Sequence, residues 1–330
     1  MDGVGWLLEG DPAIRWQVMR DITEAPAHEV EAERARVATE GWGARLLGLQ
    51  LASGQWTSET PDFSSPKAAE WWGGLGPARQ GTLFPQGTST TSSLMLLRDF
   101  GLPADDADAR LAVGLVRENV QWEHDAEPYF EGETEPCING KAVAIGAYFG
   151  QDVSSVVERL LGEQMADGGW NCEQENGSTR GSFHTTINVL EGLLEYERSA
   201  GDAPEVTAAR RRGEEYLVDR KMRRRLSNGE VIDFDRQMED TAKWDQFSYP
   251  TFWHYDVLRG LDHLRAAGVE PDERLSEAIE LVESKRDAEG LWALENPHEE
   301  RLHFDMDEGV GKPSRWNTLR AMRVLKWYGC

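Results

Sequence analysis

The sequence has few cysteines and no long hydrophobic run, and we expect no secretory leader. The 330-residue chain has three cysteines, Cys137, Cys172 and Cys330. This number is small and odd, so a disulfide framework is not expected. No stretch reaches the ~18 apolar residues of a membrane span, and Met1–Gly5 shows no basic run leading into an apolar segment. We therefore expect a cytoplasmic protein with reduced thiols and no membrane span.

Positive charge is also scarce. The chain carries 35 basic and 59 acidic residues, which give a net charge of -24. Such a field repels nucleic acid and anionic lipid, so we expect neither as a partner. The hydrophobic share of 39% is ordinary for a globular protein. Since no linker divides the sequence, we expect residues 1–330 to form one domain.

An internal repeat is the strongest signal. The segment Gln50-Leu51-Ala52-Ser53-Gly54-Gln55-Trp56 recurs as Gln164-Met165-Ala166-Asp167-Gly168-Gly169-Trp170, and 286–292 is a copy that begins with Arg286. The glycine permits a positive φ where a helix ends, and the leading polar side chain can reach the free carbonyls of the last turn. We expect the tryptophan to cover the end of the next helix, as a structural element.

Two kinds of helix alternate along the chain. Helices that open with aromatic or small polar residues are expected to begin near Trp16, Thr88, Cys137, His184, His254 and Trp316. More charged amphipathic helices are expected at 29–52, 105–121, 152–165, 203–220 and 273–286. This alternation predicts an all-α fold in which an inner ring of helices is sheathed by an outer ring. The expected architecture is an (α/α)6 toroid.

Closure of such a ring requires the segment 5–8 to meet the last helix, which is expected to end near Trp327. Two long connections interrupt the alternation, at 53–87 and at 226–250. The first contains Trp71-Trp72-Gly73-Gly74. Loops of this length are lids, binding loops or structural padding, and the sequence leaves these alternatives open.

The copies at 50–56 and 164–170 resemble the QW repeat of squalene cyclases. The alternating helices are similar to the toroid of terpenoid cyclases, protein prenyltransferase β subunits and lanthionine synthetase C proteins. The resemblance implies an enzyme that performs cyclisation or group transfer on a small to medium apolar, isoprenoid-like substrate in a central cavity. Squalene cyclases have an Asp-x-Asp-Asp motif that acts as the general acid, and the most similar segment of this sequence is 305–308, Asp-Met-Asp-Glu. The sequence also lacks the Cys-His pair of lanthionine cyclases.

One candidate site is a metal centre. Glu135 and Cys137 open one inner helix, His184 opens the next, and His254 opens the one after. In a toroid these helix starts share one mouth of the cavity, where thiolate, imidazole and carboxylate groups suit Zn²⁺. The positive end of the helix is expected to lower the pKa of Cys137. Prenyltransferase β subunits are similar in placing an Asp-x-Cys pair and a later His in this way; the alternative is a buried Cys with hydrogen-bonded His residues near helix caps.

A second candidate is an acid–base site. His184, Asn188 and Glu191 fall on one stripe of a helix, where an apolar cavity would raise the pKa of Glu191 and make it a general acid. His254 and Asp256 could assist from the adjoining helix. The alternative is a polar network that satisfies a buried helix. Asp305 and Asp307 form another pair of candidate acids, with an exposed acidic loop as the alternative.

Aromatic residues supply candidate substrate contacts. Inner-helix segments contain Tyr148, Trp253, Tyr255 and Trp316, the last next to Asn317. Aromatic faces stabilise cations and shape apolar ligands, although most of the 13 tryptophans are expected in the core.

Three functions remain open from the sequence. The first is the cyclase or transferase with Zn²⁺ as candidate cofactor. The second is a metal-independent isomerase or cyclase in which Glu191 or the carboxylates of 305–308 donate the proton. The third is a non-catalytic toroid that binds a ligand. The substrate and the need for a partner subunit stay undetermined.

Overall fold

The fold is all-α in the computed structural model, which describes residues 3–57, 79, 81–83, 87–235, 240–298 and 301–330. One small antiparallel pair, β1 (Phe234–Asp235) and β2 (Asp240–Thr241), lies within the expected 226–250 connection. Most of the 53–87 connection, with Trp71-Trp72-Gly73-Gly74, lies outside the described residues. No described helix has both the length and the apolar character needed to span a membrane.

All six helices expected as inner helices are present. They are α2 (Pro12–Asp21), α6 (Thr90–Phe100), α8 (Pro136–Tyr148), α10 (Phe183–Ala200), α12 (Val257–Ala266) and α14 (Arg315–Tyr328). Five begin at a Ser or Asp whose side chain accepts a hydrogen bond from the first turn: Asp11, Ser89, Ser182, Asp256 and Ser314. The starts near Trp16 and His254 were wrong by four and three residues, because Asp11 and Asp256 cap these helices and Pro12 and Val257 begin them.

The expected outer helices are also present. They are α3 (Ala27–Ala35), α4 (Gly41–Leu47), α7 (Ala107–Asn119), α9 (Ser154–Gly162), α11 (Pro204–Asp219) and α13 (Ser276–Ser284). The single helix expected over 29–52 is instead α3, the 3-10 turn Arg36–Ala38 and α4. The chain turns at Gly41, where φ is +64° and an added Cβ would lie 2.1 Å from Asp11 Oδ2.

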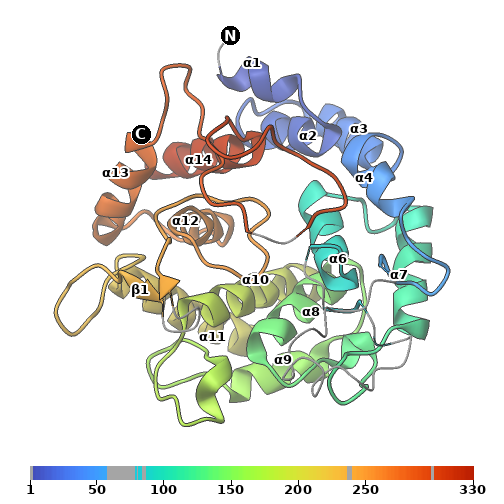
Figure 1. Cartoon of the computed structure of the whole chain (residues 1–330), viewed down its shortest axis with the longest axis horizontal. Helices are drawn as coiled ribbons and strands as arrows, with labels where there is room; N and C mark the ends of the chain where they lie inside the picture. Colours follow the sequence, from blue (N-terminus) through green and yellow to red (C-terminus); the bar gives the residue numbers. More distant parts are fainter. Residues whose placement is uncertain (1–2, 58–78, 80, 84–86, 236–239, 299–300) are drawn as a thin grey trace.

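The contacts among the inner helices form a closed series. In order, α2 contacts α6, α6 contacts α8, α8 contacts α10, α10 contacts α12, α12 contacts α14, and α14 contacts α2. The N-terminal helix α1 (Gly3–Leu8) also contacts α14, as expected for the segment 5–8. Figure 1 shows α7, α9 and α13 on the periphery of the molecule.

The closest helix pair is α8 with α10. An added Cβ at Gly140 would lie 2.4 Å from the Asn188 carbonyl oxygen, and one at Gly192 would lie 2.4 Å from the Gly140 carbonyl oxygen. Every residue of α8 from Pro136 to Ala147 is buried. A helix buried on all sides has no polar stripe, which explains why its sequence lacks amphipathic periodicity.

The three repeat copies make one and the same contact. The indole Nε1 atoms of Trp56, Trp170 and Trp292 donate to the carbonyls of Leu46, Leu160 and Val282, at 2.8, 2.7 and 2.7 Å. Each acceptor lies ten residues earlier, so the indole covers the end of the preceding outer helix; the expectation of the next helix was wrong. Gly54, Gly168 and Gly290 have φ of +88°, +90° and +83°.

In the two copies that begin with glutamine, this residue ties the repeat to the next outer helix. Gln50 Nε2 donates to the carbonyls of Gly54 and Ala112, both at 2.9 Å, and Gln164 Nε2 donates to those of Gly168 and Ala209, both at 2.8 Å. One amide therefore satisfies two carbonyls from different segments. The repeat is a structural connection between outer helices.

Candidate functional site

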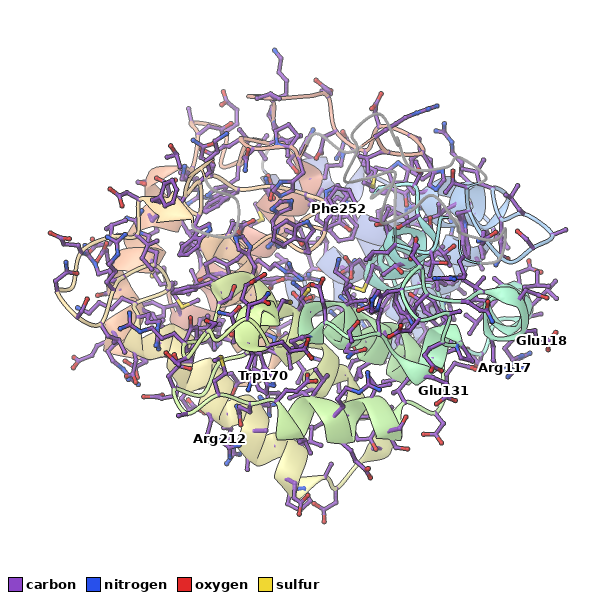
Figure 2. The ribbon with its side chains drawn as sticks, turned by 60° about the horizontal axis from the view of Figure 1, so that its bottom comes forward. Arg117, Glu118, Glu131, Trp170, Arg212 and Phe252 are labelled. Atoms are coloured by element: carbon purple, nitrogen blue, oxygen red, sulfur yellow. The ribbon has the colours of Figure 1, made fainter. Side chains whose placement is uncertain are left out.

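A cavity of about 620 Å³ lies among the inner helices. All six contribute to its lining: Gln17 of α2, Met95 of α6, Lys141 of α8, Glu195 of α10, Asp262 of α12 and Trp316 of α14. Phe252, from the connection before α12, also lines it and lies towards the middle of the molecule in Figure 2, whereas Arg117 and Glu118 lie at the edge. The volume is typical of sites for small molecules.

The lining is strongly charged, and its sign is opposite to that of the whole chain. Nine cationic side chains line the cavity: Arg20, Arg34, Arg98, Lys141, Arg198, Arg259, Arg265, Arg320 and Arg323. Five carboxylates accompany them: Asp21, Asp99, Glu191, Glu195 and Asp262. The excess of four positive charges stands against a net charge of -24 for the chain. This lining differs from the apolar one that the sequence led us to expect.

Glu191 forms a bidentate ion pair at the cavity wall. Arg259 binds it in bidentate fashion, Nε to Oε1 at 2.8 Å and Nη2 to Oε2 at 2.7 Å. Burial alone would raise the pKa of Glu191, but Arg259 and then Arg98 outweigh it and lower the pKa to about 2. The expected raised pKa was therefore wrong. An ionised Glu191 is an acceptor and has no proton to donate near neutral pH.

Other cations of the cavity contact neutral oxygen atoms or more distant carboxylates. Arg34 donates to the Gly101 carbonyl at 2.8 Å and to the Tyr148 hydroxyl at 2.9 Å. Arg320 donates to the Ser248 carbonyl at 3.0 Å, and its nearest carboxylate oxygen, on Asp256, is 3.8 Å away. These guanidinium groups retain capacity for a further anionic acceptor.

Arg323 is a buried cation of the cavity lining. It pairs with Asp21 and donates to Gln17 Oε1 at 2.7 Å. Burial lowers its pKa to about 10, against the opposing effect of Asp21 and Asp262 and with a further contribution from nearby guanidinium groups. An added negative charge would relieve that cost, because it would favour the charged form.

Four residues of the cavity lining carry a buried polar atom without a hydrogen-bond partner. These atoms are Tyr249 Oη, His263 Nδ1, Trp316 Nε1 and Arg323 Nε. The rings of Tyr249 and Trp316 stack with their centroids 4.2 Å apart. A buried polar atom without a partner costs about 1–3 kcal/mol.

Three of the predicted site residues line this cavity, namely Tyr148, Glu191 and Trp316. Tyr148 donates to the Leu102 carbonyl at 2.8 Å and accepts from Arg34. The other predicted residues do not belong to the cavity lining, and most of them make contacts that hold the helix starts.

His184 and His254 lie near each other, with ring centroids 5.9 Å apart. His184 Nδ1 accepts from the Tyr255 amide at 2.7 Å, and the His254 ring stacks on His298 at 3.6 Å. Trp253 stacks on His254 with centroids 4.1 Å apart. This arrangement is an aromatic and imidazole cluster at the start of α10 and before α12.

The remaining predicted residues act at helix starts or lie at the surface. Asp256 caps α12, accepting from the Arg259 amide at 2.7 Å, and Tyr255 donates to the Met222 carbonyl at 2.7 Å. Asn317 donates to the Ala293 carbonyl at 3.0 Å. Asp305 is exposed, while Asp307 accepts from the Ser314 hydroxyl at 2.8 Å, so these two carboxylates have different surroundings.

Among the described residues, one group of His, Cys, Asp or Glu is compact enough to hold a metal ion. Its members are Glu135, Cys137 and Cys172, whose ligand atoms all lie within 4.8 Å of one another. The structure thus joins two predicted ligands with a cysteine that the sequence did not suggest, and it does not add His184 or His254 to the group. Two thiols and one carboxylate are a donor set that Zn²⁺ accepts, with a fourth position open.

The pKa of Cys137 is raised, whereas the sequence led us to expect a lowered value. A hydrogen bond with Cys172 is the largest cause, followed by burial, and Glu135 also raises it. The positive end of α8 does not offset these effects, because the neighbouring Cys172 and Glu135 both disfavour a thiolate at Cys137. Lys141 acts in the opposite direction and also lines the cavity, so the cysteine group and the cavity are neighbours.

The sequence did not point to the arginines. Their signal was nevertheless present, since Arg98, Arg259, Arg320 and Arg323 lie inside helices whose other residues are mostly buried. Arginine is rarely buried without an anionic partner, so several arginines on helices expected to face a cavity indicate an anion site.

No known family model matches the chain, and no curated protein matches it either.

Proposed function

We propose that the chain is an (α/α)6 toroid of the type found in terpenoid cyclases and prenyltransferases. Three features support this architecture: alternating inner and outer helices, the closed series of contacts from α2 through α14, and a cavity lined by all six inner helices. The tryptophan contacts of Trp56, Trp170 and Trp292 support a repeated unit.

We propose that the cavity binds a small molecule that carries more than one negative charge, as phosphate or carboxylate. The excess of four cationic side chains in the lining is the observation that carries this proposal. A cluster of guanidinium groups at low dielectric repels itself, and an oxyanion would convert that repulsion into charge-assisted hydrogen bonds. Trp16, Leu96, Leu194 and Trp316 offer apolar surface in the same cavity.

The ligand that fits both surfaces has an apolar body and an anionic group, and an isoprenoid-like diphosphate has this chemistry. A cyclase or a transferase acting on it would use the arginines to hold the anionic group and the aromatic residues to shape the apolar body. The ionised Glu191 does not suit the role of initiating acid, which weighs against the metal-independent mechanism built on it. A non-catalytic toroid that binds the same anion is the remaining alternative.

Calorimetric titration with inorganic pyrophosphate tests the anion site, with citrate as a second arm that separates phosphate from carboxylate recognition. Arg34→Gln is the informative variant, because Arg34 donates to a carbonyl and a hydroxyl. Its replacement therefore leaves no carboxylate without its ion-pair partner. Loss of a charge-assisted contact should weaken binding about 10-fold or more. Arg117→Gln, at an exposed site on α7, is the matched control and should bind like the wild type.

Two results would refute the proposal. One is a wild-type protein that binds neither pyrophosphate nor citrate. The other is binding that Arg34→Gln leaves unchanged while circular dichroism shows the variant to be folded.

We also propose Zn²⁺ at Glu135, Cys137 and Cys172, because these are the described residues that lie close enough to share an ion. Bound zinc would act there as a Lewis acid beside the cavity. The test is the zinc content of protein purified without chelator, in wild type, in Cys137→Ala and in Cys330→Ala. Cys330 is exposed, so its variant should retain the metal that Cys137→Ala loses. A metal-free wild type would end this proposal.

A further inference from the structure

Two cysteines from different segments lie side by side, next to the closest helix pair of the fold. Cys137 is in the first turn of α8, and Cys172 begins the 3-10 turn Cys172–Gln174 that precedes α10. Their sulfur atoms lie within 4.8 Å of each other, and both are free thiols. Two thiols at this separation are suited to forming a reversible covalent bond with each other.

The segment that carries Cys172 is held in place at both of its ends. Just before it, Trp170 (Figure 2) is fixed by its indole bond to the Leu160 carbonyl, and the Ser182 amide donates to the Trp170 carbonyl at 2.8 Å. Cys172 Sγ lies 3.4 Å from the hydroxyl oxygen of Thr185, in the first turn of α10. Because α10 packs closely on α8, these contacts keep Cys172 beside the start of α8.

The two sulfur atoms differ in their access to solvent. Cys137 is buried, with 7% of its surface exposed, whereas Cys172 is half-buried. A small oxidant from solution therefore reaches Cys172 first. The thiol of Cys137 donates to Glu135 Oε2 at 3.5 Å, and Glu135 is exposed. The proton of the buried thiol thus has an acceptor that is in contact with water.

We propose that Cys172 and Cys137 are a peroxide-reactive pair that forms a reversible disulfide. In the first step the Cys172 sulfur attacks one oxygen of hydrogen peroxide, so that an S–O bond forms and the O–O bond breaks. The second oxygen leaves as hydroxide and becomes water by taking the proton of the Cys172 thiol. The product at Cys172 is a sulfenic acid.

In the second step the Cys137 sulfur, after rotation of the side chains, attacks the Cys172 sulfur. The S–S bond forms, the S–O bond breaks, and the departing hydroxide becomes water with the proton of the Cys137 thiol, which Glu135 can relay. In total, two thiols are oxidised to one disulfide and one hydrogen peroxide is reduced to two waters.

The inference depends neither on the proposed anion site nor on a bound metal ion. The disulfide would use both thiols of the group formed by Glu135, Cys137 and Cys172, so a metal ion at this group and the disulfide exclude each other. The experiment therefore uses the full chain in two samples, one as purified and one kept in chelator. Both are first reduced and then freed of the reductant.

The probe is hydrogen peroxide in an amount equimolar with the protein. Remaining thiols are then alkylated in denaturant, and mass spectrometry of the digested chain identifies linked peptides. In the chelator sample we expect two of the three thiols to be lost, a peptide pair joined through Cys137 and Cys172, and recovery of all three thiols with dithiothreitol. Cys330 is an internal control, because it is exposed and lies outside the group.

Three variants assign the two roles, with circular dichroism to show that each is folded. Cys137→Ser should stop at the sulfenic acid of Cys172, which dimedone traps. Cys172→Ser should leave the buried Cys137 as a thiol, because the residue that the oxidant reaches first is gone. Cys330→Ser is the matched control and should form the disulfide like the wild type.

The wild type alone can overturn the inference, so the conclusion does not depend on the folding of a variant. Survival of all three thiols in both samples would do so, and so would a disulfide that involves Cys330. The zinc content of the purified protein separates this inference from the metal proposal. A zinc-containing protein that forms no disulfide in chelator leaves only the metal proposal standing, and a metal-free protein that forms the disulfide leaves only the redox pair.

Discussion

The ion pair of Glu191 and Arg259 yields a quantitative prediction about stability. The change Glu191→Gln keeps the shape of the side chain and removes its charge. The pKa of Glu191 falls from 4.5 to about 2 in the folded protein because Arg259 outweighs the effect of burial. That difference corresponds to about 3 kcal/mol of stability at pH 7. The Arg259 side chain is 3% exposed, so the variant would leave a buried charge without its carboxylate.

The sign of the pH dependence follows from the direction of this pKa. Because the folded state binds the proton of Glu191 less tightly than the unfolded state does, the contribution is complete above about pH 5. It is lost as the pH falls towards about 2. Urea unfolding followed by circular dichroism should give a gap of about 3 kcal/mol between wild type and Glu191→Gln at pH 6.5. At pH 3.5 the gap should narrow to about 2 kcal/mol.

A matched control is available one turn further along α10. Glu195 lines the same cavity, but its ion pair with the half-exposed Arg198 is 3.5 Å long. Glu195→Gln should therefore cost less than about 1 kcal/mol. The reasoning would be refuted if Glu191→Gln were as stable as the wild type at pH 6.5, or if its deficit did not shrink in acid.

Three further predictions concern the frame around the cavity, and urea unfolding measures each. Trp170→Phe should cost about 1–3 kcal/mol, because the Leu160 carbonyl loses its donor, and Trp292→Phe should behave alike through Val282. Gly192→Ala should cost about 1–3 kcal/mol, since its Cβ would meet the Gly140 carbonyl, whereas Gly162→Ala on α9 meets nothing within 4 Å and should be neutral or stabilising. Ser182→Ala removes the cap of α10 and should cost about 1 kcal/mol.

Much of the helical framework could be predicted because it depends on local signals. Ser89, Ser182 and Ser314 cap helices that the sequence places within a few residues of their observed starts. The break at Gly41 was missed, because it depends on the approach of Asp11, 30 residues earlier in the chain, to the start of α4. The acceptor of each repeat tryptophan was also missed, since a sequence pattern does not reveal which of two neighbouring helix ends an indole covers.

The site was harder to predict because the start of an inner helix supplies capping groups, whereas the rest of the helix lines the cavity. Residues at the starts, such as Asp256 and Asn317, hold backbone groups of the first turn or the preceding loop. The cavity is formed further along the helices, as Glu191, Arg259 and Arg320 illustrate. The predicted site residues lie mostly at helix starts and include capping groups, whereas the arginines of the cavity lie one to three turns later.

The position of the cations raises an alternative explanation that a magnitude decides. Arg20, Arg98, Arg198 and Arg265 lie in the last turns of α2, α6, α10 and α12, where positive side chains favourably offset the partial negative charge of the helix end. Each helix end contributes about -0.5 of a charge, so four ends supply about -2. The lining carries an excess of four positive side chains, which exceeds that amount. The helix ends therefore offset part of the positive charge of these arginines, but they do not neutralise the cavity. The positive charge that remains is the part that an anionic ligand would balance.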